Sequence, residues 1–310
     1  MPLLRRKRVL AAKIESTSGT AESLANADAA FNAFDVEIQV NSEQLEREGQ
    51  GSFSSLPSVP GPRGGTLSFK TNLFGDGAAG TPGWASTLLP ACGYVESTGT
   101  FSPTTEAPGS NVKTLTMAVY EDGVKKTLRG AAGTFQITAE AGKLVMLEWT
   151  FTGVWVAPTD VAILTPTYPT ISPLRFVSTA YTLGGSTPPC TNSLTIDAGN
   201  TVILRPCPTP SDSSGYETAL ITARKPMLTI DPESQLVATN DFYGDWLSMT
   251  EQACSLALTD GTDTITIAAP KAQHLPPQEA ERSDIQVDTL EFQLNRSASA
   301  GDDELTIDFS

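Results

Sequence analysis

Two pairs of carboxylates are the side chains in this sequence best placed to do chemistry. Asp231 stands two positions before Glu233, and Asp302 stands two positions before Glu304. Carboxylates that flank a groove can hydrolyse a glycoside, one acting as the acid and the other as the base or nucleophile. Pairs at this short spacing are more often solvated or turn residues, so we expect a structural role for both.

His274 is the one histidine of the chain and lies in the segment KAQHLPP. An imidazole can orient a serine nucleophile when both line a cleft. The two prolines that follow predict a loop, where a surface histidine is the commoner case. We therefore expect no catalytic residue, no enzymatic activity and no cofactor.

The cysteines and the acidic and glycine-rich turns lack the spacing of metal or phosphate sites. The four cysteines are Cys92, Cys190, Cys207 and Cys254. Zinc sites use closely spaced cysteine pairs or histidines, so we interpret these as small apolar residues, with a Cys190–Cys207 bridge as the alternative. Residues 260–263 (DGTD) lack the distal glutamate of a calcium loop, and the glycine pairs 64–65 and 184–185 lack the lysine of a phosphate loop.

The charge of the chain is strongly acidic and unevenly spread. The formal net charge is −15, although five of the 20 basic residues stand within the first 13 positions. The other 297 residues carry 15 basic and 35 acidic groups, a formal charge of −20. A protein that grips phosphates needs clustered lysine and arginine, so this balance argues against a nucleic-acid reader. It does not exclude a surface past which DNA slides.

Composition and length predict a β-rich protein of two domains. The 310 residues include 25 glycines and 22 prolines, and charged residues make up only 18%. This composition favours short strands joined by turns over long amphipathic helices. The length is enough for two ordinary cores.

The first half reads as a basic arm followed by one β domain. We expect the arm over 1–34 and the domain over 35–156. Residues 35–40 (DVEIQV) alternate as a strand with one buried face. The Ser-, Pro- and Gly-rich residues 41–65 predict a long loop before a second strand at 66–73. A short helix is expected over 84–89, and two hairpins should turn at 121–123 and 139–142.

The second half repeats this order of elements. After a Pro- and Thr-rich linker over 157–195, a second domain is expected over 196–310. It shows strands at 219–223 and 227–230, a Trp-containing helix near 241–247, a hairpin turning at 260–261, and a last strand at 284–294. We interpret this as the duplication of one β domain. The alternative is that β-meander patterning looks repetitive anywhere, since residue identity between the halves is slight.

Several segments in this order resemble the tail tube (major tail) proteins of bacteriophages with long tails. They cover nearly the whole chain: KIESTSGT at 13–20, DVEIQV at 35–40, GTLSFK at 65–70, residues 82–89, LPACGY at 89–94, LEWTFTGVW at 147–155, IAAPKAQ at 267–273 and GDDELTI at 301–307. No single segment is as diagnostic as a metal signature.

The resemblance implies a β-sandwich flanked by a short helix, whose inner sheet joins its neighbours into a closed barrel around a lumen. Familiar members have one domain per subunit and six subunits per ring. The duplication departs from that pattern. Our hypothesis is that two tube domains per chain let a homotrimer build a pseudo-sixfold ring, and that rings stack into the tube through which the genome leaves the virion.

For such a tube, the strand and charge patterns suggest candidate residues. Carboxylates and amides on closing strands would face the lumen and repel DNA phosphates. The candidates are Asp35, Glu37, Gln39, Glu148, Asp284, Asp288 and Glu291. Ring stacking would use the basic arm and the loop 41–65. Its candidates are Arg5, Arg6, Lys7, Arg8, Arg47 and Arg63. Deleting residues 1–13 should then weaken polymerisation without unfolding the domain.

The expected partners are other copies of the chain and, as in similar tubes, tape measure, tail terminator and tail tip proteins. Genomic DNA would pass without specific binding. The apolar stretch after the basic start is too short for a signal peptide, and no run reaches the roughly 18 residues of a membrane helix, so we expect assembly in the host cytoplasm without membrane anchoring. The alternative function is a β-sandwich virion decoration or receptor-binding module, and an enzyme acting on carbohydrate ranks third.

Overall fold

The computed structural model is mainly β, as expected, and describes residues 4, 6–51, 53–78, 80–106, 110, 112–170, 172–177, 180–208 and 212–310. Its first half contains β1 (Arg8–Ile14), η1 (Asn26–Ala29), β2 (Phe34–Glu48), β3 (Ser55–Asn72), α1 (Gly83–Leu88), η2 (Leu89–Cys92), β4 (Tyr94–Ser97), β5 (Thr100–Pro103), β6 (Leu115–Glu121), β7 (Val124–Glu140) and β8 (Met146–Asp160). Its second half contains β9 (Ala180–Leu183), β10 (Thr191–Asp197), β11 (Asn200–Pro206), β12 (Tyr216–Arg224), β13 (Met227–Pro232), α2 (Phe242–Leu247), β14 (Glu251–Thr259), β15 (Thr264–His274), β16 (Gln278–Arg282), β17 (Ile285–Leu294) and β18 (Thr306–Phe309).

The strand order repeats along the main sheet, which the described strands form. Its first four strands are β2-β3-β8-β7, and the next four are β10-β13-β17-β15. In each set an antiparallel pair comes first, and β11–β12 lie between the two strands of the second pair in the chain. The last of the four strands in chain order (β8 or β17) lies beside this pair, and β7 or β15 follows, with β16 between β15 and β17 in the chain. A six-residue helix lies between the pair and β7 or β15 in both halves. The duplication of one domain stays a prediction, which this repeated strand order favours.

The two halves join edge to edge within the chain. β10 pairs antiparallel with the C-terminal part of β7, from Ser193 opposite Glu140 to Asp197 opposite Gln136. The expected boundary at 195–196 therefore falls inside β10, and the expected linker contains β9, which pairs with β14.

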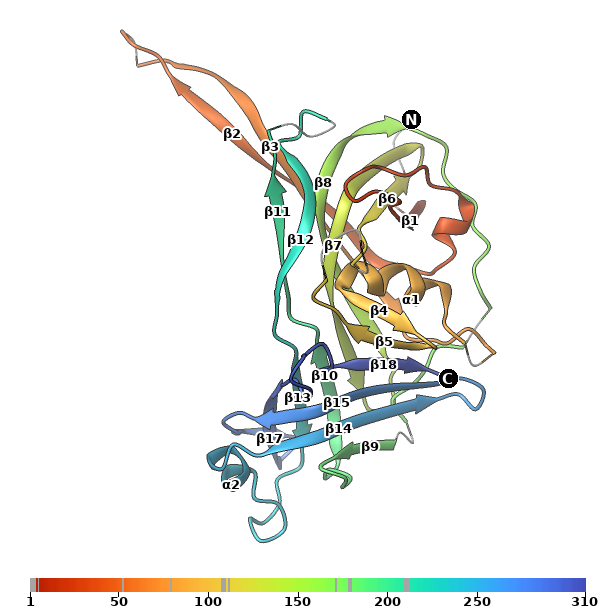
Figure 1. Ribbon diagram of the computed structural model, residues 1–310, viewed down its shortest axis with the longest axis vertical. Helices are drawn as coiled ribbons and strands as arrows, with labels where there is room; N and C mark the ends of the chain where they lie inside the picture. The colour runs from red at the N-terminus through yellow and green to blue at the C-terminus, as the bar shows by residue number, and fades with distance from the viewer. Residues whose placement is uncertain are drawn as a thin grey trace.

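A long β-hairpin replaces the loop expected over 41–65. β2 and β3 stay paired as far as Glu48 opposite Ser55, and the hairpin projects from the rest of the molecule (Figure 1). Proline lacks an N–H, which excludes it from central strands. In this two-stranded projection each strand has one edge without a partner strand. Pro57, Pro60 and Pro62 can therefore be accommodated without the loss of a hydrogen bond between strands. We call residues 41–63 the arm hairpin.

Part of the segment expected to be a basic arm is a sheet strand. β1 pairs with β6 from Arg8 opposite Glu121 to Ile14 opposite Leu115. Its central residues Leu10, Ala11 and Ala12 are buried. Apolar Val9-Leu10-Ala11-Ala12 was too short for a signal peptide but suffices for one buried strand.

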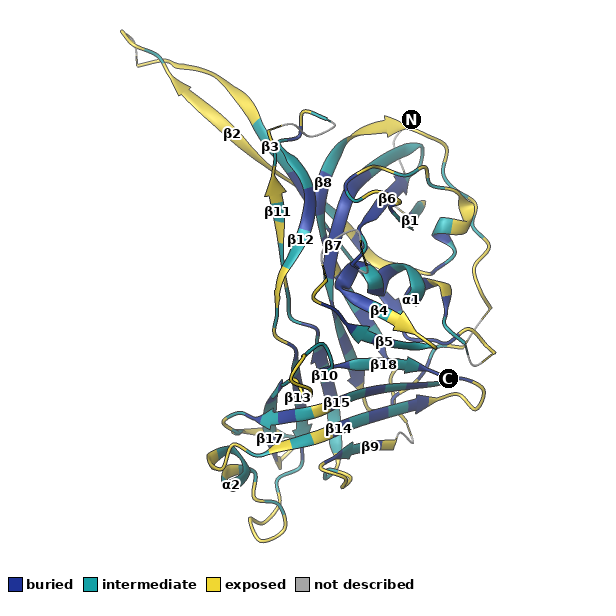
Figure 2. Cartoon of the chain, in the orientation of Figure 1, coloured by how far each residue is buried: buried dark blue, intermediate teal, exposed yellow. Residues whose placement is uncertain are grey.

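One apolar core runs through both halves (Figure 2). Around Trp149, the rings of Phe69, Phe135 and Trp84 lie with centroids 5.4–6.3 Å apart. Trp84 also meets Phe309 of the C-terminal strand at 5.8 Å, so the helix of the first half packs against the end of the chain. The halves do not fold around separate cores.

The helix and the turns that the sequence indicated are confirmed. α1 spans Gly83–Leu88 and η2 continues it to Cys92, after which Gly93 takes a left-handed φ of 79°. In the β6–β7 turn both Asp122 and Gly123 have positive φ values, 43° and 106°. Glycine adopts such values without steric cost.

Candidate functional site

A polar surface covers the face of the main sheet that is opposite the core. Across four strands Lys70, Glu148, Gln136 and Asp197 lie side by side in register. Residues on either side of each of them along the strand, such as Phe69 and Leu147, point into the core. Alternation of side chains in β-strands therefore gives the sheet one apolar and one polar face.

The same face continues through the second half. Thr138 on β7 lies opposite Thr195, which lies opposite Thr229 and then Glu291. These side chains are half-buried, so the sheet surface is partly accessible to solvent. We call it the polar sheet face. Its residues are Glu37, Gln39, Thr66, Ser68, Lys70, Thr134, Gln136, Thr138, Glu148, Thr150, Thr195, Asp197, Thr229, Glu291 and Gln293.

The charges on the polar sheet face are mostly negative. Lys70 is the basic residue among those named, and its ammonium group lies 2.7 Å from Glu148 Oε1. Beside Gln293, Lys271 of β15 adds a second cation, which lies 2.9 Å from Glu251. The hydrogen bond to Glu148 raises the pKa of Lys70, so the lysine stays charged and paired. Glu37, Asp197 and Glu291 leave an excess of carboxylate, which repels phosphates. Hydroxyl and amide groups make up most of the remainder.

Four of the lumen candidates share this face and three do not. Glu37, Gln39, Glu148 and Glu291 lie on it. Asp35 is exposed but lies where the β2–β3 register shifts, and Asp284 lies in the β16–β17 turn with a φ of 64°.

Asp288 departs from the expectation because it is only 6% exposed. β17 pairs with β16 up to Thr289 and with β13 from Leu290 onward. The neighbours Val287 and Asp288 are both buried, so burial does not alternate along β17 at this change of partner.

The hairpin β11–β12 covers the other end of this face (Figure 1). A methyl group of Leu204 packs directly over Gly64 of β3. A Cβ atom at position 64 would lie only 2.4 Å from this methyl group, so a larger residue would clash. Gly65 likewise faces Leu128 on the core side, at 2.6 Å. This glycine pair is therefore a packing feature.

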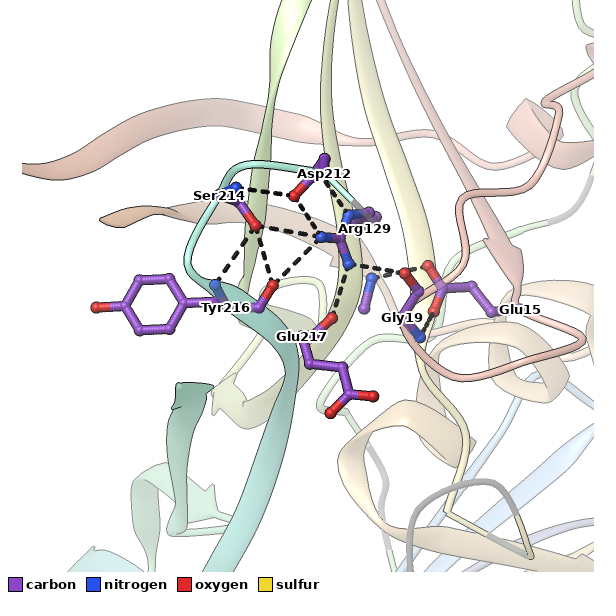
Figure 3. A network of polar contacts seen from close by, with 8 residues as sticks. Glu15, Gly19, Arg129, Asp212, Ser214, Tyr216 and Glu217 are labelled. Carbon is purple, nitrogen blue, oxygen red and sulfur yellow. Dashed lines mark hydrogen bonds and ion pairs between the residues drawn. The ribbon is translucent and has the colours of Figure 1, made fainter. Parts of the chain in front are cut away.

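Arg129 fixes the tip of β11–β12 to the first half (Figure 3). The side chain is 4% exposed and donates to both carboxylate oxygens of Asp212, at 2.8 and 3.0 Å, and to the backbone oxygens of Gly19 and Glu217, both at 2.7 Å. Partial burial raises the pKa of Asp212, but hydrogen bonds from Arg129 and Ser214 outweigh it and bring the pKa to about 2.

Glu15 forms a second buried polar cluster beside Arg129. Its carboxylate accepts from the backbone N–H groups of Gly19 and Gly130, both at 2.7 Å, and from the hydroxyls of Thr114 and Thr116. Neither Glu15 nor Arg129 was singled out from the sequence. A lone arginine among the glycines and alanines of TLRGAAG was the available signal.

The carboxylate pairs considered for catalysis are held by arginines. Arg282 contacts Asp231 at 3.0 Å and Glu233 at 3.3 Å. Arg224 pairs with Asp302 at 2.9 Å and also with Glu304. Both pairs are therefore engaged in ion pairs with an arginine.

His274 is not the surface residue that its prolines suggested. It ends β15, is 2% exposed, and its ring lies 4.5 Å from that of Phe292. Burial lowers its pKa, although Asp245 at 3.9 Å partly opposes this effect. Cys190 carries a free thiol, so the Cys190–Cys207 bridge is not formed.

The expected stacking residues do not gather in one place. Arg8 pairs with Glu121, and Lys7 lies 3.4 Å from Asp122, at the end of β1. Arg47 is exposed on the arm hairpin, and the Arg63 backbone N–H donates to Ser214 O at its base. Arg6 is exposed, and Arg5 lies outside the described residues.

The family model for phage tail tube proteins matches residues 5–310. The chain belongs to the phage tail tube family. This tail tube protein is thus a structural component of the virion tail. A search of curated proteins found no match to it.

The described residues contain neither a metal-binding cluster nor a membrane-spanning helix. No group of three or more His, Cys, Asp or Glu side chains in this part of the tail tube protein is arranged to hold a metal ion. None of the helices within the same ranges has the length and apolarity to span a bilayer.

Proposed function

We propose that this tail tube protein polymerises into stacked rings whose lumen is lined by the polar sheet face. The observation that carries the proposal is that one such face continues through both halves of the chain. A DNA duplex that passes a surface of hydroxyl, amide and carboxylate groups finds no cluster of cations to bind. The genome would leave the virion through this channel without specific contacts.

Three chains make one ring in this proposal. The order β2-β3-β8-β7 recurs as β10-β13-β17-β15, so one chain supplies two similar arcs of inner sheet. Three chains would supply six arcs, the number that single-domain relatives of this kind are expected to use. Closure removes the open sheet edges of a lone chain, which otherwise favour aggregation.

The arm hairpin is proposed to contact the next ring. It extends β2 and β3 beyond the sheet, and Leu45, Leu56 and Val59 are 42–46% exposed on it. Arg47 adds a positive charge that could meet the acidic surface of a neighbour. Charged contacts at the rim of an interface set its register and the rate of association, while the apolar side chains supply affinity.

Assembly is proposed to take place in the host cytoplasm with tape measure, terminator and tail tip proteins, without membrane anchoring. The first test is negative-stain electron microscopy of the concentrated, purified protein. Hollow tubes with a regular axial repeat are expected. Compact monomers that persist across salt conditions would contradict self-assembly, and six chains per layer by mass measurement would contradict the trimer.

A further inference from the structure

The internal joint between β7 and β10 shows how two arcs of this sheet connect. Residues 136–140, the last five of β7, pair antiparallel with residues 193–197, and Thr138 opposite Thr195 is the central pair. The helical region of the first half also reaches the second, since Asn200 Nδ2 donates to Cys92 O at 2.7 Å. Strand pairing and a contact from the helix therefore occur together at this joint.

The second half presents the strand edge that corresponds to the end of β7. β16 spans Gln278–Arg282 and pairs with β17 as the end of β7 pairs with β8. The connection to the return strand is shorter, because residues 283–284 follow β16 where residues 141–145 follow β7. In the described part of the chain β17 is its one strand partner, and most of its residues are exposed. The edge that β10 fills on β7 is thus open on β16.

The counterpart of β10 is open as well. β2 begins the sheet order and pairs with β3 alone among the described strands. Glu37 stands between the inward-facing Val36 and Ile38, as Thr195 stands between Leu194 and Ile196. A hollow opens beside this part of β2, and its lining mixes apolar residues such as Leu10, Phe31 and Val36 with the charged Arg6, Arg8, Asp35 and Glu37.

The helix next to β16 is exposed where its counterpart is buried. In α1 Trp84, Ala85 and Leu88 are buried, whereas α2 has no buried residue. Leu247 and Met249, at and just after its end, are 71% and 70% exposed. Tyr243 Oη lies 3.5 Å from Glu279 of β16, which places α2 at the same open edge.

We propose that β16 of one chain pairs antiparallel with β2 of a second copy, centred on Ala280 opposite Glu37, and that α2 covers the joint. This inference rests on the proposed function and names the strands that close its ring. The register is transferred from Thr138 opposite Thr195, because Ala280 stands two residues before the end of β16 as Thr138 does in β7. It also places Arg282 opposite Asp35. Each ring then alternates internal and intermolecular joints of one design.

A disulfide cross-link tests the pairing. The variant Glu37→Cys/Ala280→Cys, made with Cys190→Ser and Cys207→Ser, is assembled, oxidised mildly and run on a non-reducing gel. We expect conversion to covalent species of up to three chains. Thr138→Cys/Thr195→Cys is the matched control, because the same cysteine pair in the internal joint should lose its thiols while the chain keeps the mass of a monomer. Each single-cysteine variant should give no three-chain species.

The outcomes separate the inference from the proposed function. Tubes that form but do not cross-link, with the second cysteine at 279, 280 or 281, overturn the β16–β2 joint and leave the tube function standing. An unsubstituted chain that forms no tubes under any salt condition overturns the function itself.

A second pair of variants covers the case in which the cysteine variant does not fold. Leu247→Asp/Met249→Asp should raise the concentration needed for assembly by about tenfold or more, because it places charge in the buried part of an interface. The thermal midpoint should stay unchanged, since both side chains are exposed in the single chain. Val161→Asp, at a 39% exposed apolar residue outside α2 and β16, is the control. Equal assembly by both variants would contradict the role of α2.

Discussion

At the scale of residues, the buried charges of this protein join segments that are far apart in the sequence. Arg129 links the residues around Gly19, the strand β7 and the tip of β11–β12 through six hydrogen bonds. A buried guanidinium is tolerated only when its N–H groups donate hydrogen bonds. Removal of the arginine or of its acceptors leaves buried polar groups without partners.

Arg129→Ala should lower the free energy of unfolding by about 3–5 kcal/mol, because it leaves buried acceptors unpaired. Urea denaturation measures this change. Arg205→Ala is the matched control, since Arg205 pairs with Glu217 but its side chain is 58% exposed. Its loss should cost no more than about 1 kcal/mol. Similar losses in the two variants would argue against the buried network.

Asp212 should make stability fall in acid. Its pKa is lowered from 3.8 to about 2 in the folded chain, so its contribution is present above pH 3.8 and is lost as pH falls toward 2. Urea midpoints between pH 5 and pH 2.5 should decline more steeply for the natural chain than for Asp212→Asn. Parallel declines would contradict this assignment.

At the scale of elements, the sequence predicted the helices and turns whose conformation depends on neighbouring residues in the chain. The helix over 84–89 could be predicted because Gly93 ends it, and the β6–β7 turn because Asp122 and Gly123 accept positive φ. The arm hairpin could not be predicted from its prolines, since their cost depends on whether a third strand lies alongside. The burial of His274 and Asp288 depends on which strands meet β15 and β17, which no local pattern reports.

The N-terminal strand changes what truncation should do. Removal of residues 1–13 deletes most of β1 and with it the buried Leu10 and Ala12, so unfolding should become easier by at least about 3 kcal/mol. Removal of residues 1–7 leaves β1 whole and should change stability by less than about 1 kcal/mol. Circular dichroism melts compare the two. Equal melts would show that β1 contributes little.

The arm hairpin should matter for assembly and not for folding. Leu45→Ser/Leu56→Ser/Val59→Ser changes side chains already exposed in the single chain, so its unfolding free energy should stay within about 0.5 kcal/mol. Tube length in electron micrographs should fall sharply if the arm meets the next ring. Glu46→Ala on the same arm is the control. Tubes of normal length from the triple variant would contradict the stacking role.

At the scale of the whole molecule, the acidic polar sheet face makes a prediction about DNA. Tubes of Gln136→Lys/Glu291→Lys should retain short DNA duplexes at low salt and release them as salt rises. The added lysines neutralise phosphates and release the counterions bound to DNA, and this gain in affinity falls as the salt concentration increases. Thr159→Lys/Asp160→Lys makes the same change in charge at exposed positions of β8. If both variants retain DNA equally, or neither does, the polar sheet face is not the channel wall.

The internal β7–β10 joint has a kinetic consequence for such a ring. Half of the joints in a three-chain ring form within a chain when that chain folds. These joints cost no translational freedom, whereas a joint between separate subunits does. A ring then closes after two encounters, where six single-domain subunits would need five. Fewer partial arcs can accumulate, and those that do consist of one or two chains. Fusion of the repeats thus favours complete rings when the protein is scarce.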